Sequence, residues 1–384
     1  MTSLFASIYQ GKRVAVTGHT GFKGSWLALW LTTLGAQVFG LALPPQTKPN
    51  LFEALGLAEQ IVHCEGDIRN MATVQAFMAE AQPHIVFHLA AQPIVRLSYT
   101  DPVSTFATNV QGTVHILEAF RHCPSAQVFV NVTSDKCYEN REWLWGYRES
   151  DPLGGHDPYS ASKGCAELVS QAYQRSFFRS GDPSKRKLLA TVRAGNVIGG
   201  GDWSPDRIVP DTVRSLVRGE PIQVRNPRAI RPWQHVLEPL AGYLWLGARL
   251  WTEGDTFTGP WNFGPQADAA VPVGTLVETM ITHWGTGSWI DIAAPKAPHE
   301  AQWLRLSCEK AQSRLGWQAV YSFEQTVQAT LDWYRHFYRQ RASDYACEAT
   351  MTEYTLQQIK DYVAAARHAR QPWVQRARIF EEKI

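Results

Sequence analysis

The sequence lacks a strong excess of charge of either sign. Among its 384 residues, 37 Lys and Arg are balanced by 35 Asp and Glu, which gives a formal net charge of +2. A surface that binds nucleic acid needs a larger positive excess, so we expect no nucleic-acid partner. The chain also lacks any run of 18 apolar residues, and residues 1–10 lack the basic and apolar segments of a secretory signal. We therefore expect a cytoplasmic protein without a membrane contact.

Cysteine patterns that would build a disulfide framework or a zinc site are also missing. The six cysteines are scattered, without CxxC pairs or histidines at metal-ligand spacing: Cys64, Cys123, Cys137, Cys165, Cys308 and Cys347. We expect reduced thiols and no metal centre. Hydrophobic residues make up 45% of the chain and charged residues 19%, which is the balance of an ordinary globular protein. Its length favours a core domain with a second lobe.

Short apolar runs alternate with amphipathic segments through the first half of the chain. The runs of strand length are 13–18, 37–43, 61–67, 84–90, 127–134 and 188–196, and the helix-like segments between them include 22–34, 71–81, 102–121 and 159–179. This βαβ alternation predicts an α/β fold, a Rossmann-type doubly wound parallel sheet.

After Asn196 the pattern loosens into Gly- and Pro-rich stretches at 199–210 and 221–232, where a smaller C-terminal substrate-binding lobe is expected. Residues 258–263 resemble a strand that returns to the sheet. We predict a Rossmann domain from 1–196 plus about 231–263, a smaller lobe from about 197–230 plus 264–340, and a polar helical extension over 341–384.

A glycine-rich loop directly follows the first predicted strand and opens a helix. Gly18 permits a tight turn, Gly21 lets the backbone approach a pyrophosphate, and Gly24 packs the helix on the sheet. The alternative is a loop that serves only as a turn. The strand and helix context favours a dinucleotide site, whose predicted residues here are Gly18, His19, Thr20, Gly21, Phe22, Lys23 and Gly24.

Other predicted contacts to the dinucleotide come from later strand ends. Asp67, next to Ile68, stands where a carboxylate can accept the adenine amino group, although it could instead be the N-cap of the next helix. Small residues after the fourth strand let a flat cofactor lie close to the backbone, unless they form an ordinary strand end. The predicted contacts are Asp67, Ile68, Leu89, Ala90, Ala91, Gln92 and Asn109.

The second strand ends without the acidic residue that grips a ribose 2′-hydroxyl, since Ala42 stands there. No arginine follows to hold a 2′-phosphate. The sequence does not settle NAD against NADP, and we favour NAD.

Tyr159 and Lys163 form a YxxxK pair, which places both side chains on one helix face. An ammonium beside a phenol favours the phenolate, so Tyr159 can take the proton of a hydroxyl while a hydride leaves its carbon. Lys163 would also hold a ribose hydroxyl. The pair predicts hydride chemistry on an alcohol.

Three polar residues, Ser134, Asp135 and Lys136, follow the fifth strand, at the sheet edge where open α/β sheets place ligands. Alcohol oxidation needs only the serine hydroxyl. The adjacent carboxyl group and amine add an acid and a base, which indicates further proton transfers. The alternative is an ion pair in a surface loop.

Together these motifs resemble the extended short-chain dehydrogenases that act on nucleotide sugars, over about residues 12–338. In that family 4,6-dehydratases carry an acid–base dyad after the serine or threonine, most often Asp-Glu in the dTDP-glucose enzymes, whereas simple 4-epimerases lack it. The dyad Asp135-Lys136 and the segment 139–149 resemble the 4,6-dehydratases that act on CDP-glucose. The alternatives are a 4-epimerase, a 4,6-dehydratase for another sugar nucleotide, and a non-enzymatic dinucleotide sensor. A sensor usually lacks the Tyr or Lys of the YxxxK pair.

The resemblance implies an NAD-dependent, redox-neutral conversion of CDP-glucose to its 4-keto-6-deoxy product and water. Tyr159 and Ser134 would serve the C4 hydroxyl, Lys136 would remove the C5 proton, and Asp135 would protonate the departing C6 hydroxyl. It also implies a homodimer or homotetramer built on segments 102–121 and 159–179, and a product used for a surface polysaccharide such as a lipopolysaccharide O-antigen.

The substrate lobe offers further candidates through the same resemblance. Six arginines lie between 207 and 231, of which Arg231 is the strongest candidate for the diphosphate because its guanidinium matches phosphate oxygens. The predicted substrate-binding residues are Asn196, Arg207, Arg231, His235, Asn262 and His299.

Overall fold

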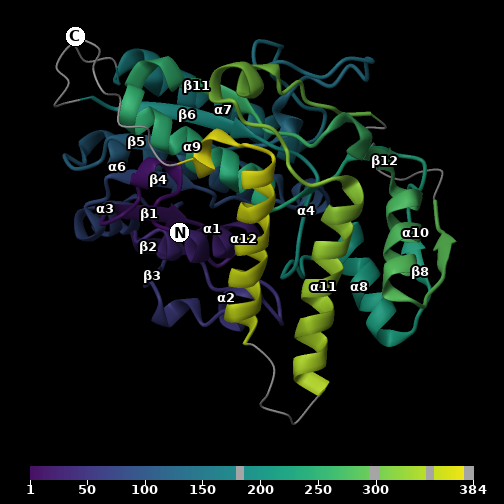
Figure 1. Ribbon diagram of the computed structural model, residues 1–384. Coiled ribbons are helices and arrows are strands. Elements are labelled where there is room, and N and C mark those ends of the chain that lie inside the picture. The colour runs from purple at the N-terminus through teal and green to yellow at the C-terminus, as the bar shows by residue number, and fades with distance from the viewer. Residues whose placement is uncertain (179–185, 294–302, 343–349, 376–384) are drawn as a thin grey trace.

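The chain folds around a seven-stranded parallel sheet (Figure 1). The computed structural model describes residues 1–178, 186–293, 303–342 and 350–375. The strand order is β11-β6-β5-β4-β1-β2-β3, and every neighbouring pair is parallel. The strands are β1 (Arg13–Thr17), β2 (Gln37–Ala42), β3 (Val62–Glu65), β4 (Ile85–His88), β5 (Val128–Val132), β6 (Leu188–Arg193) and β11 (Gly259–Asn262). The predicted doubly wound sheet is therefore confirmed, and the run at 258–263 is its edge strand.

Helices cover both faces of this sheet, as buried parallel strands require. On one face lie α1 (Phe22–Thr33) and α9 (Leu237–Glu253), which share a core with apolar side chains of β1, β5 and β6. On the other face lie α3 (Met71–Ala81), α6 (Gly112–His122) and α7 (Pro158–Ser176). The strand order reverses between β1 and β4, so the carboxyl ends of β1 and β4 open on a ligand-binding crevice.

The segment predicted as one helix over 102–121 contains a local change of pitch. It runs as α5 (Pro102–Phe106), a π-helical turn (Ala107–Gln111) and α6, and a shorter helix, α4 (Val95–Thr100), precedes it. Such turns inside helices are frequent at functional sites. Here the turn carries Asn109, whose side chain is buried.

Local sequence signals fix where α7 begins. The Asp157 carboxylate accepts a hydrogen bond from the Ser160 backbone N–H at 2.9 Å, and Pro158 occupies the first helical position, where a missing N–H costs nothing. This cap sets the helix that carries Tyr159 and Lys163. Both residues therefore lie within its first two turns.

A smaller lobe lies beyond the carboxyl ends of the strands, at the right of Figure 1. It contains α8 (Ile208–Arg218), α10 (Val273–Trp284) and three two-stranded sheets. The sheets pair β7 (Val197–Ile198) with β10 (Gln234–His235), β8 (Ile222–Val224) with β13 (Trp289–Asp291), and β9 (Ile230–Pro232) with β12 (Ala270–Pro272). The boundaries between the two domains stay a prediction.

The C-terminal segment adds two helices, α11 (Phe323–Ala342) and α12 (Met351–His368), which lie side by side in Figure 1. The described part of the predicted extension contains α12, which packs on α1 and α11 with one buried face, and the bounds of the extension stay a prediction. Trp373 stacks on Phe5 with ring centroids 5.0 Å apart, so the end of the described chain closes over its beginning. This extension is part of the core rather than an appendage.

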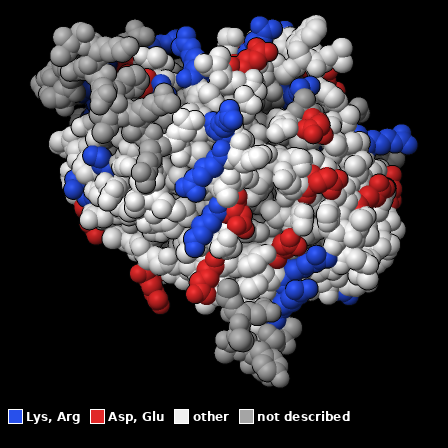
Figure 2. All heavy atoms as spheres, in the orientation of Figure 1, with Lys and Arg blue, Asp and Glu red and all other residues white. Residues whose placement is uncertain are grey.

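Among the described residues, the face of the molecule that Figure 2 shows has no broad patch of one charge sign. Figure 2 shows Lys and Arg side chains interspersed with Asp and Glu around α11 and α12. None of the helices within the described ranges combines the length and the apolar character that crossing a membrane requires.

Glu238, a buried carboxyl group on α9, makes the stability of the C-terminal packing depend on pH. Its oxygens accept hydrogen bonds from the backbone N–H groups of Val320 and Tyr321 and from the hydroxyl of Tyr362 on α12. Burial outweighs these bonds and raises the pKa of Glu238 to about 7. The folded state then holds a proton that the unfolded chain has already lost, so stability falls as the pH rises from the unfolded value to the folded one.

We expect Glu238→Gln to remove this pH dependence. The wild-type free energy of unfolding should fall by about 2 to 3 kcal/mol relative to the variant as the pH rises from 4.5 to 7.5. Urea titrations across that range measure it. If the free energy of unfolding changed with pH in the same way in both proteins, Glu238 would not hold a proton in the folded state.

Candidate active site

The glycine-rich loop is packed so closely that two of its glycines accept no side chain. Gly18 has a positive φ of 76°, and a Cβ there would lie 2.7 Å from the Ala90 backbone nitrogen. A Cβ on Gly24 would lie 2.1 Å from the Gly18 carbonyl oxygen. Gly21 is the N-cap of α1, and among the described residues no side chain caps that helix. Its first N–H groups are thus available to an anionic ligand such as a dinucleotide pyrophosphate.

His19 of this loop pairs with His63 of β3 beside Gly40 of β2, two residues before Ala42. The His19 Nε2 lies 2.7 Å from the His63 Nδ1, and a Cβ on Gly40 would lie 2.5 Å from the His19 ring. Burial, with the neighbouring His63 adding to it, lowers the pKa of His19 to about 3, so this ring is neutral. Sequence reasoning missed His63, because 44 residues separate it from its partner.

Asp67 lies just after β3, in the loop that leads to α3. The Arg69 guanidinium donates to its carboxylate at 2.6 Å and, with burial opposing, holds the pKa of Asp67 below its ordinary value. The alternative that Asp67 caps the next helix is wrong, because Asn70 is the N-cap of α3. An ionised carboxylate beside the crevice remains compatible with the predicted contact to adenine.

Asn109 links the end of β4 to the catalytic helix. Its Oδ1 accepts the Gln92 backbone N–H at 2.8 Å, and its Nδ2 donates to the Ser162 hydroxyl at 2.8 Å. The π-helical turn places it there, so this predicted cofactor residue ties the backbone after β4 to α7. Leu89, Ala90 and Ala91 continue from β4 along the same edge.

Tyr159 and Lys163 lie one turn apart on α7, and both are buried. Burial lowers the pKa of Lys163 to about 8, and its ammonium donates to the Val132 carbonyl oxygen at 3.4 Å. Burial raises the pKa of Tyr159 to about 12, although a hydrogen bond with Ser134 acts in the opposite direction. In the ligand-free protein the tyrosine is thus a phenol, and a cationic cofactor ring would favour its phenolate.

The acid–base candidates Asp135 and Lys136 lie in a short helix directly after β5. The Ser134 hydroxyl donates to the Asp135 Oδ1 at 3.0 Å and accepts the Lys136 backbone N–H at 3.2 Å. All three residues line a cleft of about 320 Å³, together with Tyr159 and the substrate candidates Asn196, Arg207 and Arg231. The structure therefore brings the serine, the dyad, the tyrosine and part of the substrate lobe to one cavity.

Because Gly195 has no side chain, it leaves room for the carboxyl group of Asp135. A Cβ on this glycine would lie 1.8 Å from the Asp135 Oδ2, too close for both to remain in place. We expect Gly195→Ala to displace the carboxyl group and lower kcat by roughly tenfold or more, because small misplacements of catalytic groups are costly. The matched control is Gly164→Ala on α7, where the closest contact of a new Cβ is an ordinary 3.4 Å. Equal turnover by both variants would show that Asp135 needs no such space.

Of the six predicted arginines, three line the cleft: Arg207, Arg225 and Arg231. The Arg207 guanidinium donates to Asp202 at 2.9 Å, and Arg225 donates to Asp206 at 2.5 Å. Sequence reasoning missed the two aspartates and Arg96, which approaches Asp206 at 3.9 Å from α4. The contacts of Asp206 with Arg225 and Arg96 join separate segments, so only the fold reveals them, whereas Asp202 and Arg207 lie five residues apart in one loop.

Two predicted substrate residues lie away from this cleft. His235 is fully buried on β10, and burial lowers the pKa of its ring to about 3. Asn262 is fully buried on β11, where its amide accepts the Tyr138 hydroxyl and donates to the Tyr147 carbonyl oxygen. Both side chains therefore lie in the protein interior and not on the wall of the cleft. The sixth candidate, His299, lies outside the described residues.

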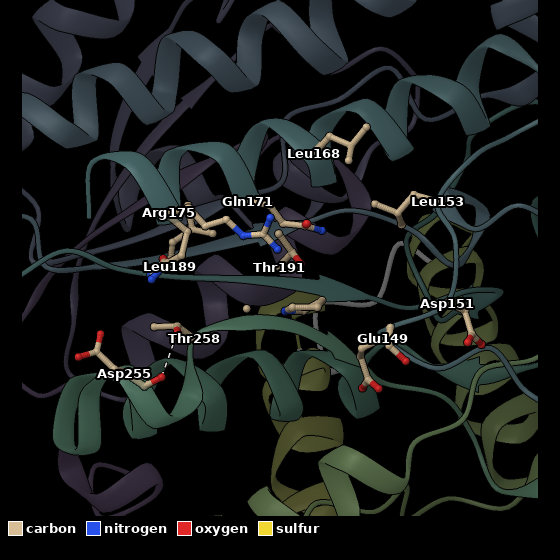
Figure 3. Close-up of a pocket in the computed structure, with 14 residues that line it drawn as sticks. Glu149, Asp151, Leu153, Leu168, Gln171, Arg175, Leu189, Thr191, Asp255 and Thr258 are labelled. Carbon is tan, nitrogen blue, oxygen red and sulfur yellow. Dashed lines mark hydrogen bonds between the residues drawn. The ribbon is translucent and has the colours of Figure 1, made fainter. Parts of the chain in front are cut away.

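A larger cavity of about 950 Å³ opens at the edge of the sheet, between α7 and β11 (Figure 3). In the figure, Arg175 lies near Gln171 and Thr191, while Glu149 and Asp151 lie toward the opposite end. None of the predicted site residues lines it within the described chain. Size alone thus does not identify the candidate active site, because Asp135, Lys136 and Tyr159 line the smaller cleft.

The sequence matches the model of one protein family, described as the NAD dependent epimerase/dehydratase family, over residues 14–254. It is 51% identical over 335 residues to a CDP-glucose 4,6-dehydratase from Salmonella typhimurium, covering 87% of this chain and 93% of that protein. It is 26% identical over 333 residues to a dTDP-glucose 4,6-dehydratase from Xanthomonas campestris pv. campestris, covering 83% of this chain and 92% of that protein.

Solved structures with the same architecture share less sequence. A dTDP-glucose 4,6-dehydratase from Streptomyces venezuelae superposes with a TM-score of 0.72 at 23% identity, covering 84% of this chain and 96% of the other. A UDP-glucose 4-epimerase from Thermotoga maritima superposes with a TM-score of 0.72 at 21% identity, covering 85% and 99%. At these identities the likeness concerns the fold, and it agrees with the predicted doubly wound sheet and C-terminal lobe.

Proposed function

Because the chain belongs to the NAD dependent epimerase/dehydratase family, we propose that it is a CDP-glucose 4,6-dehydratase, a hydro-lyase that converts CDP-glucose to CDP-4-keto-6-deoxyglucose and water. The observation that carries this proposal is the dyad Asp135-Lys136, which lines one cleft with Ser134 and Tyr159. A 4-epimerase moves only the proton of the C4 hydroxyl and the hydride at C4, so it has no use for a second acid and base beside the sugar.

NAD fits the crevice at the carboxyl ends of β1 and β4. The first turn of α1, which no side chain of the described residues caps, offers N–H groups to its pyrophosphate, and Gly18 packs directly on the Ala90 backbone. Asp67 and Lys163 would hold its adenine and nicotinamide ends. When bound, NAD supplies the redox chemistry, accepting a hydride from the sugar C4 and returning it to C6.

The side chains of this chain then move the protons. Tyr159, as a phenolate beside Lys163, takes the proton of the C4 hydroxyl, which Ser134 holds by a hydrogen bond. A ketone at C4 acidifies the C5 proton, and Lys136, in its neutral form, removes it. Asp135, in its protonated form, donates to the C6 hydroxyl as it leaves as water. Lys136, now an ammonium, would return a proton to C5 as the hydride returns to C6, which completes the 4-keto-6-deoxy sugar. These transfers need groups that line one cavity, as Ser134, Asp135, Lys136 and Tyr159 do.

The diphosphate of the substrate would lie against the smaller lobe. Arg231 lies on β9 and lines the cleft, as do Arg207 before α8 and Asn196 before β7. Guanidinium groups form two parallel hydrogen bonds to phosphate oxygens, which suits them to fix the substrate in register. This assignment leaves the sugar at the end of the cleft where Ser134 and Tyr159 lie.

We also propose a homo-oligomer built on α4, α5 and α7. Apolar side chains on these helices are exposed, with Val103 at 78%, Leu168 at 56% and Leu97 at 47%. In a two-fold symmetric dimer these apolar side chains pack against the same side chains of the second chain. We propose that the protein acts in the cytoplasm, because NAD and sugar nucleotides are cytoplasmic metabolites. We also propose that the product serves deoxy-sugar synthesis for a polysaccharide such as a lipopolysaccharide O-antigen.

We expect Val103→Glu to break this interface, because two copies of a carboxylate would be buried together at the two-fold contact. The molar mass from light scattering should then fall to that of one chain. Leu144→Glu is the control, since Leu144 is 81% exposed on a loop outside these helices. A wild-type protein with the mass of one chain would contradict the proposed oligomer.

The direct test of the activity offers CDP-glucose with NAD and compares it with dTDP-, GDP- and UDP-glucose. We expect a 4-keto-6-deoxy product, recognised by its ultraviolet absorbance in base and by a mass lower by one water, from CDP-glucose. Formation of CDP-galactose without loss of water would establish an epimerase instead. Faster turnover of another sugar nucleotide would overturn the cytidine assignment.

A further inference from the structure

Lys23 is a cation in a position that the fold itself does not favour. It is the second residue of α1, where the positive end of the helix dipole repels an ammonium group. Within the described ranges its ammonium forms no hydrogen bond or ion pair. Lys23 is half-buried, and a partly desolvated charge without a partner destabilises a protein unless a ligand supplies the partner.

The surroundings of Lys23 are those of the substrate cleft. The side chain lines that cavity with Asp135, Tyr159, Asp202 and Arg207. Burial, assisted by the charge of Arg207, lowers the pKa of Lys23 to about 8, against the opposing charge of Asp135. An anionic ligand in the cleft would raise the pKa of Lys23 and so favour its charged ammonium form.

The balance of charges in the cleft also indicates an anion beside Lys23. Six basic side chains and four carboxyl groups line it, which leaves two positive charges for a ligand: Lys23, Arg96, Lys136, Arg207, Arg225, Arg231, and Asp135, Asp202, Asp206, Asp211. Arg207 and Arg225 already pair with Asp202 and Asp206. Lys136 is assigned above to proton removal. Arg96 lies 3.9 Å from Asp206, and Arg231 is assigned above to the diphosphate. Lys23 has neither a carboxylate partner within the described ranges nor a role in the proposed chemistry.

We propose that Lys23 binds the diphosphate of the sugar nucleotide, so that one glycine-rich loop contacts both ligands. The loop backbone would receive the cofactor, and the Lys23 side chain would cross to the substrate from the side opposite the arginines of the smaller lobe. This inference rests on the proposed function, and it changes the role of Lys23 from the cofactor contact expected from the sequence to a substrate contact. The rival source of the same chemistry is the pyrophosphate of the dinucleotide.

The test compares Lys23→Met with the wild type in calorimetric titrations of the NAD-loaded protein. A charge-assisted hydrogen bond predicts that the Kd for CDP rises by about 10-fold to 100-fold, while the Kd for cytidine, which has no phosphate, stays within about twofold. The Kd for NAD should also stay within about twofold. Lys23→Arg should restore most of the affinity for CDP, and Lys360→Met, an exposed lysine on α12, is the matched control.

Two outcomes would overturn the inference. Weaker NAD binding with unchanged CDP binding would assign Lys23 to the cofactor. Unchanged affinity for both ligands would show that Lys23 binds neither of these anions. These results are separate from the fate of the proposed function, which wild-type turnover of CDP-glucose decides. A wild type that binds CDP without dehydrating CDP-glucose would refute the function and leave the comparison of CDP affinities valid.

Discussion

Replacing Lys136 by methionine is expected to lower kcat for dehydration of CDP-glucose by a factor of about 10² to 10⁴, the range that general-base catalysis supplies. Methionine keeps much of the length of the side chain and removes the amine that would take the C5 proton. The short helix after β5 should persist, because the Lys136 contact to Ser134 comes from its backbone N–H. Exchange of the C5 hydrogen with solvent deuterium, followed by mass spectrometry, measures the step directly.

Lys136→Arg separates the charge of this side chain from its basicity. A guanidinium stays protonated at every accessible pH, so it preserves the positive charge and cannot act as a base. If Lys136 removes the proton, the arginine variant should be as slow as the methionine variant while still binding CDP. An arginine variant with near wild-type turnover would show that only the charge matters, and the elimination would need another base.

The parts of the fold that the sequence predicted are those specified by local patterns. Strand β1, helix α3 and edge strand β11 each follow from a hydrophobic period and a nearby turn or cap, such as Asn70 before α3. The three motifs at 17–24, 134–136 and 159–163 converge for a topological reason, because each lies at or beside the carboxyl end of a parallel strand near the point where the strand order reverses.

What the sequence could not predict are pairs between distant segments. The positions of His235 and Asn262 suggested ligand contacts, yet the structure buries both, since strand pairing and neighbouring aromatic side chains decide where they point. The direction of Lys23 was equally hidden, because the spacing of the glycines places its backbone and says nothing about which cavity its side chain enters. Aspartates 202 and 206 pair with arginines only once the smaller lobe has folded.

The strongest long-range pair lies directly beneath the catalytic helix. Glu167 on α7 and Arg193 at the end of β6 are both fully buried, with an N–O distance of 2.8 Å. Hydroxyl groups of Thr133 and Thr191 donate to the same carboxylate at 2.5 and 2.7 Å. Burial opposes the charge, but Arg193 and these hydroxyl groups hold the pKa of Glu167 below its ordinary value. This network ties α7 to β6 and to the residue that directly follows β5.

We therefore expect Glu167→Gln to lower the free energy of unfolding by about 3 to 5 kcal/mol, because it leaves the Arg193 guanidinium buried without a counter-charge. Urea titration at neutral pH measures the loss, and Glu118→Gln is the control. Glu118 pairs with Arg121 at the surface, where an ion pair contributes at most about 1 kcal/mol.

The double variant Glu167→Leu with Arg193→Met distinguishes a penalty for an unpaired charge from a net contribution of the pair. Apolar residues of similar volume often replace a buried ion pair with little loss. The double variant should therefore be more stable than Glu167→Gln, while its kcat falls because the four hydrogen bonds that orient α7 are gone. A double variant less stable than the single one would mean that the pair itself stabilises the fold.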